Sequence, residues 1–153
     1  MHLIGYGNPG RGDDGLGPAF AEWVLELGHR EITIAIDYQL TVDHALWIAD
    51  ASRVVFVDAL MDADGPFVFA AATSAPTNDL SSHTLTPASV MTLAATLYDA
   101  EPEAYVLGIT GKAFDEVREG LSMEAEQNLS LAKTFFLQWL ETPCRGLANG
   151  ALN

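Results

Sequence analysis

The sequence has little positive charge, one cysteine and no long apolar run. Lys and Arg together number 7 against 21 Asp and Glu, which gives a formal net charge of −14. Because no basic stripe is available to neutralise phosphates, we expect no nucleic-acid partner, and an anionic membrane surface is disfavoured for the same reason. A metal ion or a basic partner suits this charge better, while the simplest interpretation of the acidity is that it keeps the protein soluble.

The single cysteine, Cys144, excludes an internal disulfide and fits a reducing compartment. No positively charged leader precedes an apolar run, and no segment of about 18 apolar residues occurs. These absences predict a cytoplasmic protein without a membrane span. No apolar stripe remains once a core is assigned, so we also expect a monomer.

Strand-like and helix-like segments alternate along the chain. With 153 residues, 49% of them hydrophobic, we expect one domain over residues 1–141 and a frayed tail over 142–153. Apolar and β-branched runs predict strands at residues 2–6, 32–36, 54–57, 67–71 and 104–109. Helical spacing predicts helices over about 16–27, 41–51, 87–98 and 123–141, the last three with Thr41, Thr86 and Ser122 as N-caps. This order predicts a mostly parallel sheet with helices on both faces.

A glycine-rich turn follows the first expected strand, with the sequence G-Y-G-N-P-G-R-G-D-D-G-L-G over residues 5–17. Glycine lets the backbone adopt positive φ and approach other groups closely. Two adjacent carboxylates, Asp13 and Asp14, lie at the end of the turn, next to the start of the first helix. Such a turn either cradles a phosphate or presents acids.

The phosphate interpretation starts from a formal G-x-G-x-x-G match after a strand, with Asp37 at the end of the second strand as a ribose-binding acid. A dinucleotide site needs the helix to begin within the glycine motif, and here Pro9 and further residues postpone it. Asp13 and Asp14 would also repel phosphate charges at close range. A nucleotide-binding Rossmann-like domain is therefore the less favoured alternative.

The metal interpretation places three side chains at one sheet edge. In a parallel sheet, ligands bind beyond the carboxyl ends of the strands. Asp14 follows the first strand, Asp58 ends the strand at 54–57, and His83 follows a long polar loop. Two carboxylates and an imidazole suit a divalent ion such as zinc, nickel or iron.

Each of these residues also has a simpler interpretation. Asp14 is placed to cap the first helix, Asp58 to begin an Asx-turn, and His83 to lie on the surface of a polar loop. Asp13 is interpreted as a solvated neighbour or a group behind the ligands. The remaining histidines are interpreted as structural, namely His2, His29 and His44.

Covalent catalysis has weak support in the sequence. Ser82, His83 and Asp58 supply the residue types of a triad, but adjacent residues on an extended loop point apart. The chain has no G-x-S-x-G nucleophile elbow. Cys144 lies in the expected tail beside Pro143, with no base recruited to it.

Taken together, these residues make the chain similar to the nickel–iron hydrogenase maturation endopeptidases. The resemblance lies in the motif over residues 5–17, in Val57-Asp58-Ala59 and in His83 followed by a helix. It implies a three-layer α/β/α sandwich around a twisted, mostly parallel five-stranded sheet. It also implies a protease that removes a C-terminal extension from the hydrogenase large-subunit precursor once nickel has been inserted.

In that family, two acids and a histidine contact the nickel of the substrate, and the matching positions here are Asp14, Asp58 and His83. Many relatives have Glu where this chain has Asp14, and many have Gly-Gly-Thr where this chain has Tyr38-Gln39-Leu40 after Asp37. We expect a mechanism without a protein nucleophile, in which the metal acts as a Lewis acid and a carboxylate not bound to the metal, Asp13 or Asp14, acts as general base. A non-catalytic module that binds a metal or a partner on the same sheet remains the alternative.

Overall fold

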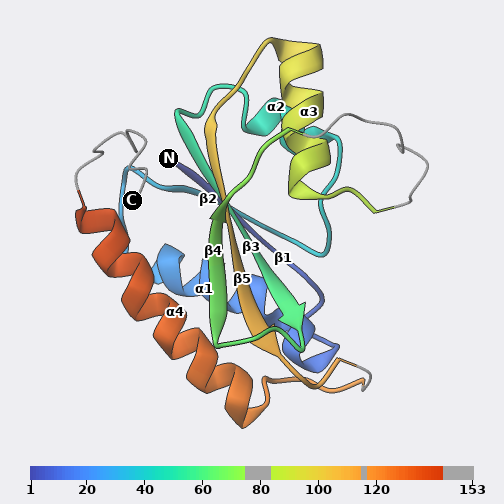
Figure 1. Cartoon of the computed structure of the whole chain (residues 1–153), viewed down its shortest axis with the longest axis vertical. Helices are drawn as coiled ribbons and strands as arrows, with labels where there is room; N and C mark the ends of the chain where they lie inside the picture. Colours follow the sequence, from blue (N-terminus) through green and yellow to red (C-terminus); the bar gives the residue numbers. More distant parts are fainter. Residues whose placement is uncertain (75–83, 115–116, 143–153) are drawn as a thin grey trace, which may run out of the picture.

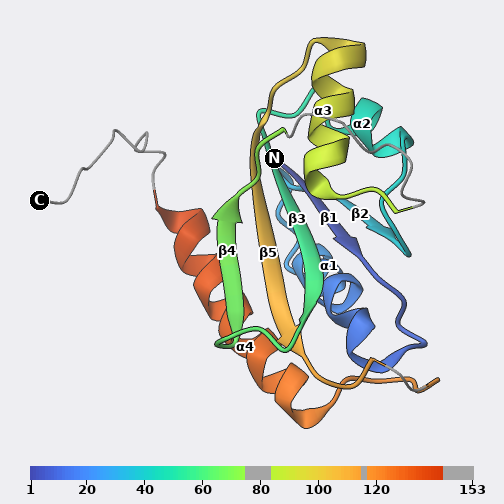
Figure 2. The ribbon, with the colours of Figure 1, turned by 45° about the vertical axis from the view of Figure 1, so that its right-hand side comes forward.

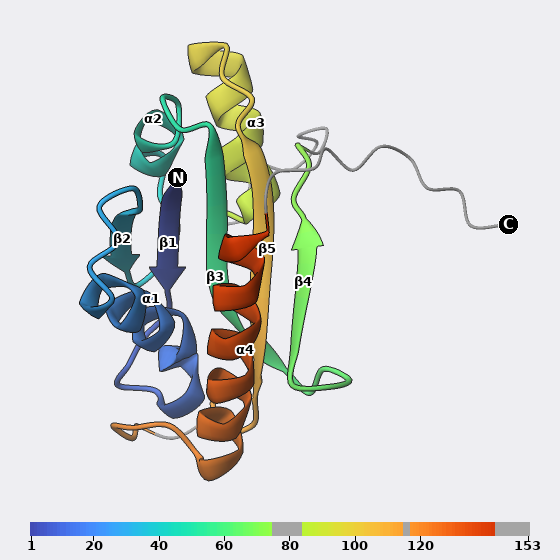
Figure 3. The same ribbon diagram turned by 90° about the vertical axis from the view of Figure 1, so that its left-hand side faces the viewer.

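The computed structural model describes residues 1–74, 84–114 and 117–142. Its strands form one five-stranded sheet in the order β2-β1-β3-β5-β4 (Figure 3). The strands are β1 (His2–Tyr6), β2 (Thr33–Asp37), β3 (Arg53–Met61), β4 (Phe67–Ala71) and β5 (Glu103–Gly111). All neighbouring pairs are parallel except β4 with β5, which is antiparallel. The predicted mostly parallel, five-stranded sheet is confirmed.

Helices cover both faces of the sheet. On one face lie α1 (Leu16–Glu26) and α4 (Met123–Glu141), and on the other lie α2 (Asp43–Trp47) and α3 (Pro87–Tyr98) (Figures 1 and 3). A short 3-10 helix, η1 (Gly12–Gly15), connects the turn after β1 to α1. The three layers confirm the expected sandwich. Among the described residues, no helix is both long and apolar enough to cross a bilayer.

Two of the three predicted helix caps are present. The Thr86 hydroxyl accepts a hydrogen bond from the Ser89 amide, and the Ser122 hydroxyl accepts one from the Ala125 amide, both at 3.2 Å. Each bond satisfies an amide that the first turn of a helix leaves without an intrahelical partner. Helices α3 and α4 therefore begin where these local signals predict.

The prediction for the helix at 41–51 is wrong in both its cap and its length. Helix α2 covers only Asp43–Trp47, and its N-cap is Val42, which makes no side-chain capping bond. Instead of capping the helix with its side chain, Thr41 donates a hydrogen bond from its backbone amide to His44 Nδ1 at 2.9 Å. A different local bond, from the Thr41 amide to the imidazole, is therefore present where a cap was expected.

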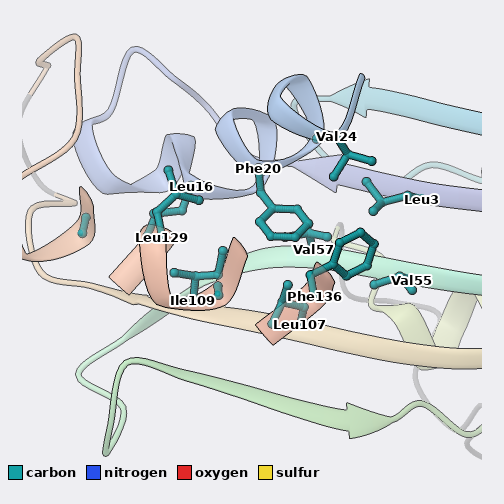
Figure 4. Packing of buried hydrophobic residues seen from close by; sticks show 13 residues of the cluster. Leu3, Leu16, Phe20, Val24, Val55, Val57, Leu107, Ile109, Leu129 and Phe136 are labelled. Carbon is teal, nitrogen blue, oxygen red and sulfur yellow. The ribbon is translucent and has the colours of Figure 1, made fainter. Parts of the chain in front are cut away.

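Two apolar clusters hold the layers together. The cluster under α1 and α4 contains Phe20 and Phe136, which point toward one another above β3 with ring centroids 5.2 Å apart at 82° (Figure 4). The cluster under α2 and α3 contains Ile4 and Phe56 from the neighbouring strands β1 and β3. All four side chains are fully buried, and each such burial contributes roughly 1.5–3 kcal/mol.

Helix α1 approaches the sheet closely at one glycine. A Cβ at Gly17 would overlap the carbonyl oxygens of Tyr6 and Val57, at the ends of the β1–β3 pairing. These are backbone atoms that cannot move without displacing the strands. Gly17 therefore sets how near the start of α1, and the turn before it, lies to the sheet.

We expect Gly17→Ala to lower the free energy of unfolding by about 2–3 kcal/mol, because steric overlap with two carbonyls outweighs the helix propensity that alanine adds. Urea unfolding followed by circular dichroism measures the change. Gly10→Ala is the matched control, since a Cβ there meets only the Asn8 side chain at 3.2 Å. Equal stability of the two variants would contradict the role given to Gly17.

Candidate active site

Asp14 lies in η1, directly above the turn that follows β1. Its Oδ2 accepts a hydrogen bond from the Asn8 amide at 2.9 Å. Gly7 has φ of +140°, and a Cβ there would overlap the Asp14 carbonyl oxygen and lie 3.5 Å from Asp14 Oδ1. Neither η1 nor α1 has a side-chain capping bond at its start. The acid is therefore held by the glycine turn rather than by capping a helix, and no side chain at position 7 covers Oδ1.

Asp58 lies inside β3 rather than at its end, which corrects the sequence-based expectation. β3 continues to Met61 because β5 pairs with it as far as Gly111, whereas its pairing with β1 stops at Val57. Asp58 is thus the first residue of β3 beyond its ladder with β1. Its Oδ1 accepts a hydrogen bond from the Ala59 amide at 2.8 Å.

The environment of Asp58 opposes its ionisation. Burial is the largest cause that raises its pKa, and the negative charge of Asp14 raises it further, while bonds from the Ala59 amide and the Tyr6 hydroxyl partly offset both, so the pKa lies at about 6. Burial and the Asp58 charge raise the pKa of the Tyr6 phenol, which therefore stays protonated as a donor. The two carboxylates are close enough to repel, so a cation between them would relieve an existing electrostatic cost.

Asp13 is fully buried, so its interpretation as a solvated neighbour is wrong. Its Oδ2 accepts from the Lys112 amide at 2.8 Å, the Ala113 amide at 2.9 Å and the Ser122 hydroxyl at 2.7 Å, and its Oδ1 accepts from the Ser122 amide at 2.7 Å. Burial alone would raise its pKa, but these bonds outweigh burial and hold the pKa below its usual value. Asp13 thereby fastens the glycine turn to the segment after β5, which lies beside it (Figure 2).

The backbone amides of the glycine turn already donate hydrogen bonds to acceptors in the protein itself. Acceptors in the protein bind the N–H groups of Gly7, Asn8, Gly10, Arg11, Gly12 and Asp13. A phosphate cradle needs amides that point toward the ligand and have no other acceptor. The geometry therefore favours the presentation of acids over the binding of a phosphate.

The third expected metal ligand, His83, lies outside the described residues, as do Ser82, Cys144 and the tail over 143–153. Within the parts that are described, no group of three His, Cys, Asp or Glu side chains is placed to hold a metal ion. Of the predicted site residues, the structure thus brings together Asp14 and Asp58, with Asp13 behind the turn.

The sequence interpretation missed a pairing between Asp37 and His44. His44 is buried, and its Nε2 lies 2.9 Å from Asp37 Oδ2 at the end of β2. Because the Thr41 amide can only donate, His44 Nδ1 is its acceptor, and Nε2 is the ring nitrogen that donates to Asp37. Asp37 ends β2 and His44 lies in α2, so the two residues share no helix or strand whose period could pair them, and only the folded turn reveals this contact.

Solved structures of hydrogenase maturation proteases share this architecture. The hydrogenase maturating endopeptidase HybD from E. coli superposes with a TM-score of 0.72 at 18% identity, over 91% of this chain and 90% of that one. The chain has the fold of these proteases. The [NiFe] hydrogenase maturation protease HycI from Thermococcus kodakarensis KOD1 gives a TM-score of 0.68 at 22% identity, over 88% of each chain. No protein-family model and no curated protein matches the sequence, so the likeness to the maturation proteases is one of fold.

Proposed function

We propose that the protein is an endopeptidase that removes the C-terminal extension of a nickel-loaded [NiFe] hydrogenase large-subunit precursor. The observation that supports this most is the meeting of Asp14 and Asp58 at the carboxyl edge of the sheet, in the fold of hydrogenase maturation proteases. This edge, between strands whose connections run in opposite directions, is where open α/β sheets bind ligands.

The two carboxylates fit a nickel ion that arrives with the substrate. One oxygen of each is held by a backbone amide, from Asn8 for Asp14 and from Ala59 for Asp58, which fixes both groups before the substrate binds. Carboxylate and imidazole are ligands that nickel accepts, so the proposed set is Asp14, Asp58 and His83. The metal in the precursor would polarise the scissile carbonyl or a water molecule.

Of the two acids proposed as general base, Asp14 fits better than Asp13. Asp13 accepts four hydrogen bonds and has a lowered pKa, so it is a poor proton acceptor and serves as a positioning residue. Asp14 is only partly buried and accepts a backbone amide on Oδ2 alone among the described residues. In the proposed step, Asp14 acts as base while it is not bound to the metal: water adds to the carbonyl carbon and gives a proton to Asp14, which passes it to the leaving amine as the peptide C–N bond breaks.

The test is to incubate the purified protein with a nickel-loaded large-subunit precursor and to follow the precursor by mass spectrometry. We expect loss of a C-terminal peptide from the loaded precursor and none from a nickel-free one. A binding module would associate with the precursor and leave its mass unchanged, which would refute the proposal. A nucleotide-binding domain would instead show a raised Tm with an adenine nucleotide.

A further inference from the structure

The few cationic side chains of this protein differ in whether they have a partner. In the parts of the chain that the structure describes, two pair with carboxylates and a third lies over an aromatic ring, namely Arg53 with Glu103, Lys112 with Glu124 and Lys133 with Trp23. The other described cations, Arg11, Arg30 and Arg118, form no ion pair or ring contact. Because the chain has 21 Asp and Glu, this does not come from a shortage of carboxylates.

Arg11 and Arg118 are far apart in the sequence but are neighbours in the fold. The Arg118 amide donates to the Gly10 carbonyl at 3.0 Å, and the Gly12 amide donates to the Arg118 carbonyl at 2.8 Å, so Arg11 and Arg118 are partners in an isolated parallel bridge. Partners in such a bridge point to the same side, with their backbones about 5 Å apart. Both residues are exposed. Like charges placed side by side repel, so an anion bound between them would stabilise the pair.

The arginine pair lies beside the candidate active site. Arg11 directly precedes η1, and the Asp14 amide donates to the Arg11 carbonyl at 3.4 Å. Arg118 belongs to the segment after β5, which passes beside the glycine turn (Figure 2). Its neighbour Val117 is 99% exposed, the highest value among the large hydrophobic side chains that the structure describes. Two unpaired arginines next to an apolar side chain in water have the composition of a protein-binding surface, where arginine is enriched.

We infer that Arg11, Val117 and Arg118 dock an acidic segment of the large-subunit precursor; this inference rests on the proposed function. A guanidinium binds a carboxylate through two parallel N–H···O bonds, so two adjacent guanidinium groups suit a segment that carries carboxylates. Charge identifies the occupant. With a net charge of −14, the protein repels an acidic segment over most of its surface and attracts it where two unpaired cations meet. Since Arg11 and Asp14 lie in one turn, docking here brings the adjoining chain of the precursor toward Asp14.

The binding test follows the association of the full-length protein with a dye-labelled, nickel-loaded precursor by stopped-flow fluorescence, before cleavage occurs. Because main-chain atoms form the bridge, glutamine at either position keeps it. We expect Arg11→Gln and Arg118→Gln each to weaken binding about three- to tenfold, chiefly through slower association, and the loss to shrink as the salt concentration rises. Arg30→Gln removes an exposed cation between α1 and β2 and should bind like the wild type. Equal binding of all four proteins, or equal losses in the three variants, would overturn the inference.

Cleavage of the same precursor separates this inference from the proposed function. We expect the double variant Arg11→Gln/Arg118→Gln to raise KM at least tenfold with kcat nearly unchanged, because the arginines contact the partner away from the reacting bond. If the wild type cleaves and the double variant has the same KM, the docking inference fails and the protease function stands. If no precursor is cleaved while association depends on the two arginines as described, the protease function fails and the docking surface stands. Self-association of the wild type that the double variant abolishes would assign the surface to a second copy of the chain and overturn the inference.

Discussion

Asp13→Ala is expected to lower the free energy of unfolding by about 3–5 kcal/mol. The substitution leaves three part-buried amides, those of Lys112, Ala113 and Ser122, and the Ser122 hydroxyl without their acceptor, and each such loss costs about 1–3 kcal/mol before relaxation. Urea unfolding at pH 7 measures the change. Asp14→Ala is the control, because that carboxylate accepts one amide bond and should cost about 1 kcal/mol.

The pH dependence of the same variant gives a second check on Asp13. The folded protein holds the pKa of Asp13 below its usual value of about 3.9, so its ionised form stabilises the fold above that value. This contribution is lost as the pH falls through the folded pKa. The stability difference between the wild type and Asp13→Ala should therefore shrink as the pH falls below about 4. A difference that stays constant over this range would contradict the account.

Asp58→Asn is expected to reduce cleavage of the nickel-loaded precursor at least a thousandfold while it stabilises the fold at neutral pH. The asparagine side chain lacks the negative charge that is proposed to bind the metal. It also lacks the cost of ionising a buried carboxyl group beside Asp14. Asp14→Asn and His83→Ala should likewise abolish cleavage. Asp64→Asn, exposed in the turn after β3, is the control for the loss of one negative charge.

The sign of the Asp58 effect follows from its raised pKa. Between an unfolded value of about 3.9 and the folded value of about 6, the unfolded chain loses a proton that the folded chain keeps, so wild-type stability falls as the pH rises through this window. The total is on the order of 3 kcal/mol. Asp58→Asn should lack this fall, match the wild type near pH 3.5 and exceed it at pH 7. Full activity, or a variant less stable than the wild type at pH 7, would refute the assignment.

The local sequence determined much of the architecture of this protein. Alternating strand and helix patterns predicted the sheet, and the caps at Thr86 and Ser122 predicted where α3 and α4 begin, because a capping bond joins residues three apart. The rule that parallel strands present their carboxyl ends at one edge placed Asp14 and Asp58 together. These predictions depend on spacing along the chain and on the general geometry of sheets.

The tertiary structure decided what each acid is available to do. Asp13 and Asp14 are adjacent in sequence, yet Asp13 is buried because the glycine turn docks on a segment about a hundred residues away, and Asp14 is only partly buried. Asp58 lies in β3 just beyond the pairing of β3 with β1. Its pKa is raised because the carboxyl group is largely buried there and lies near the charge of Asp14. Burial and charge at a site depend on which distant segments pack there, and no local pattern of residue types encodes that packing.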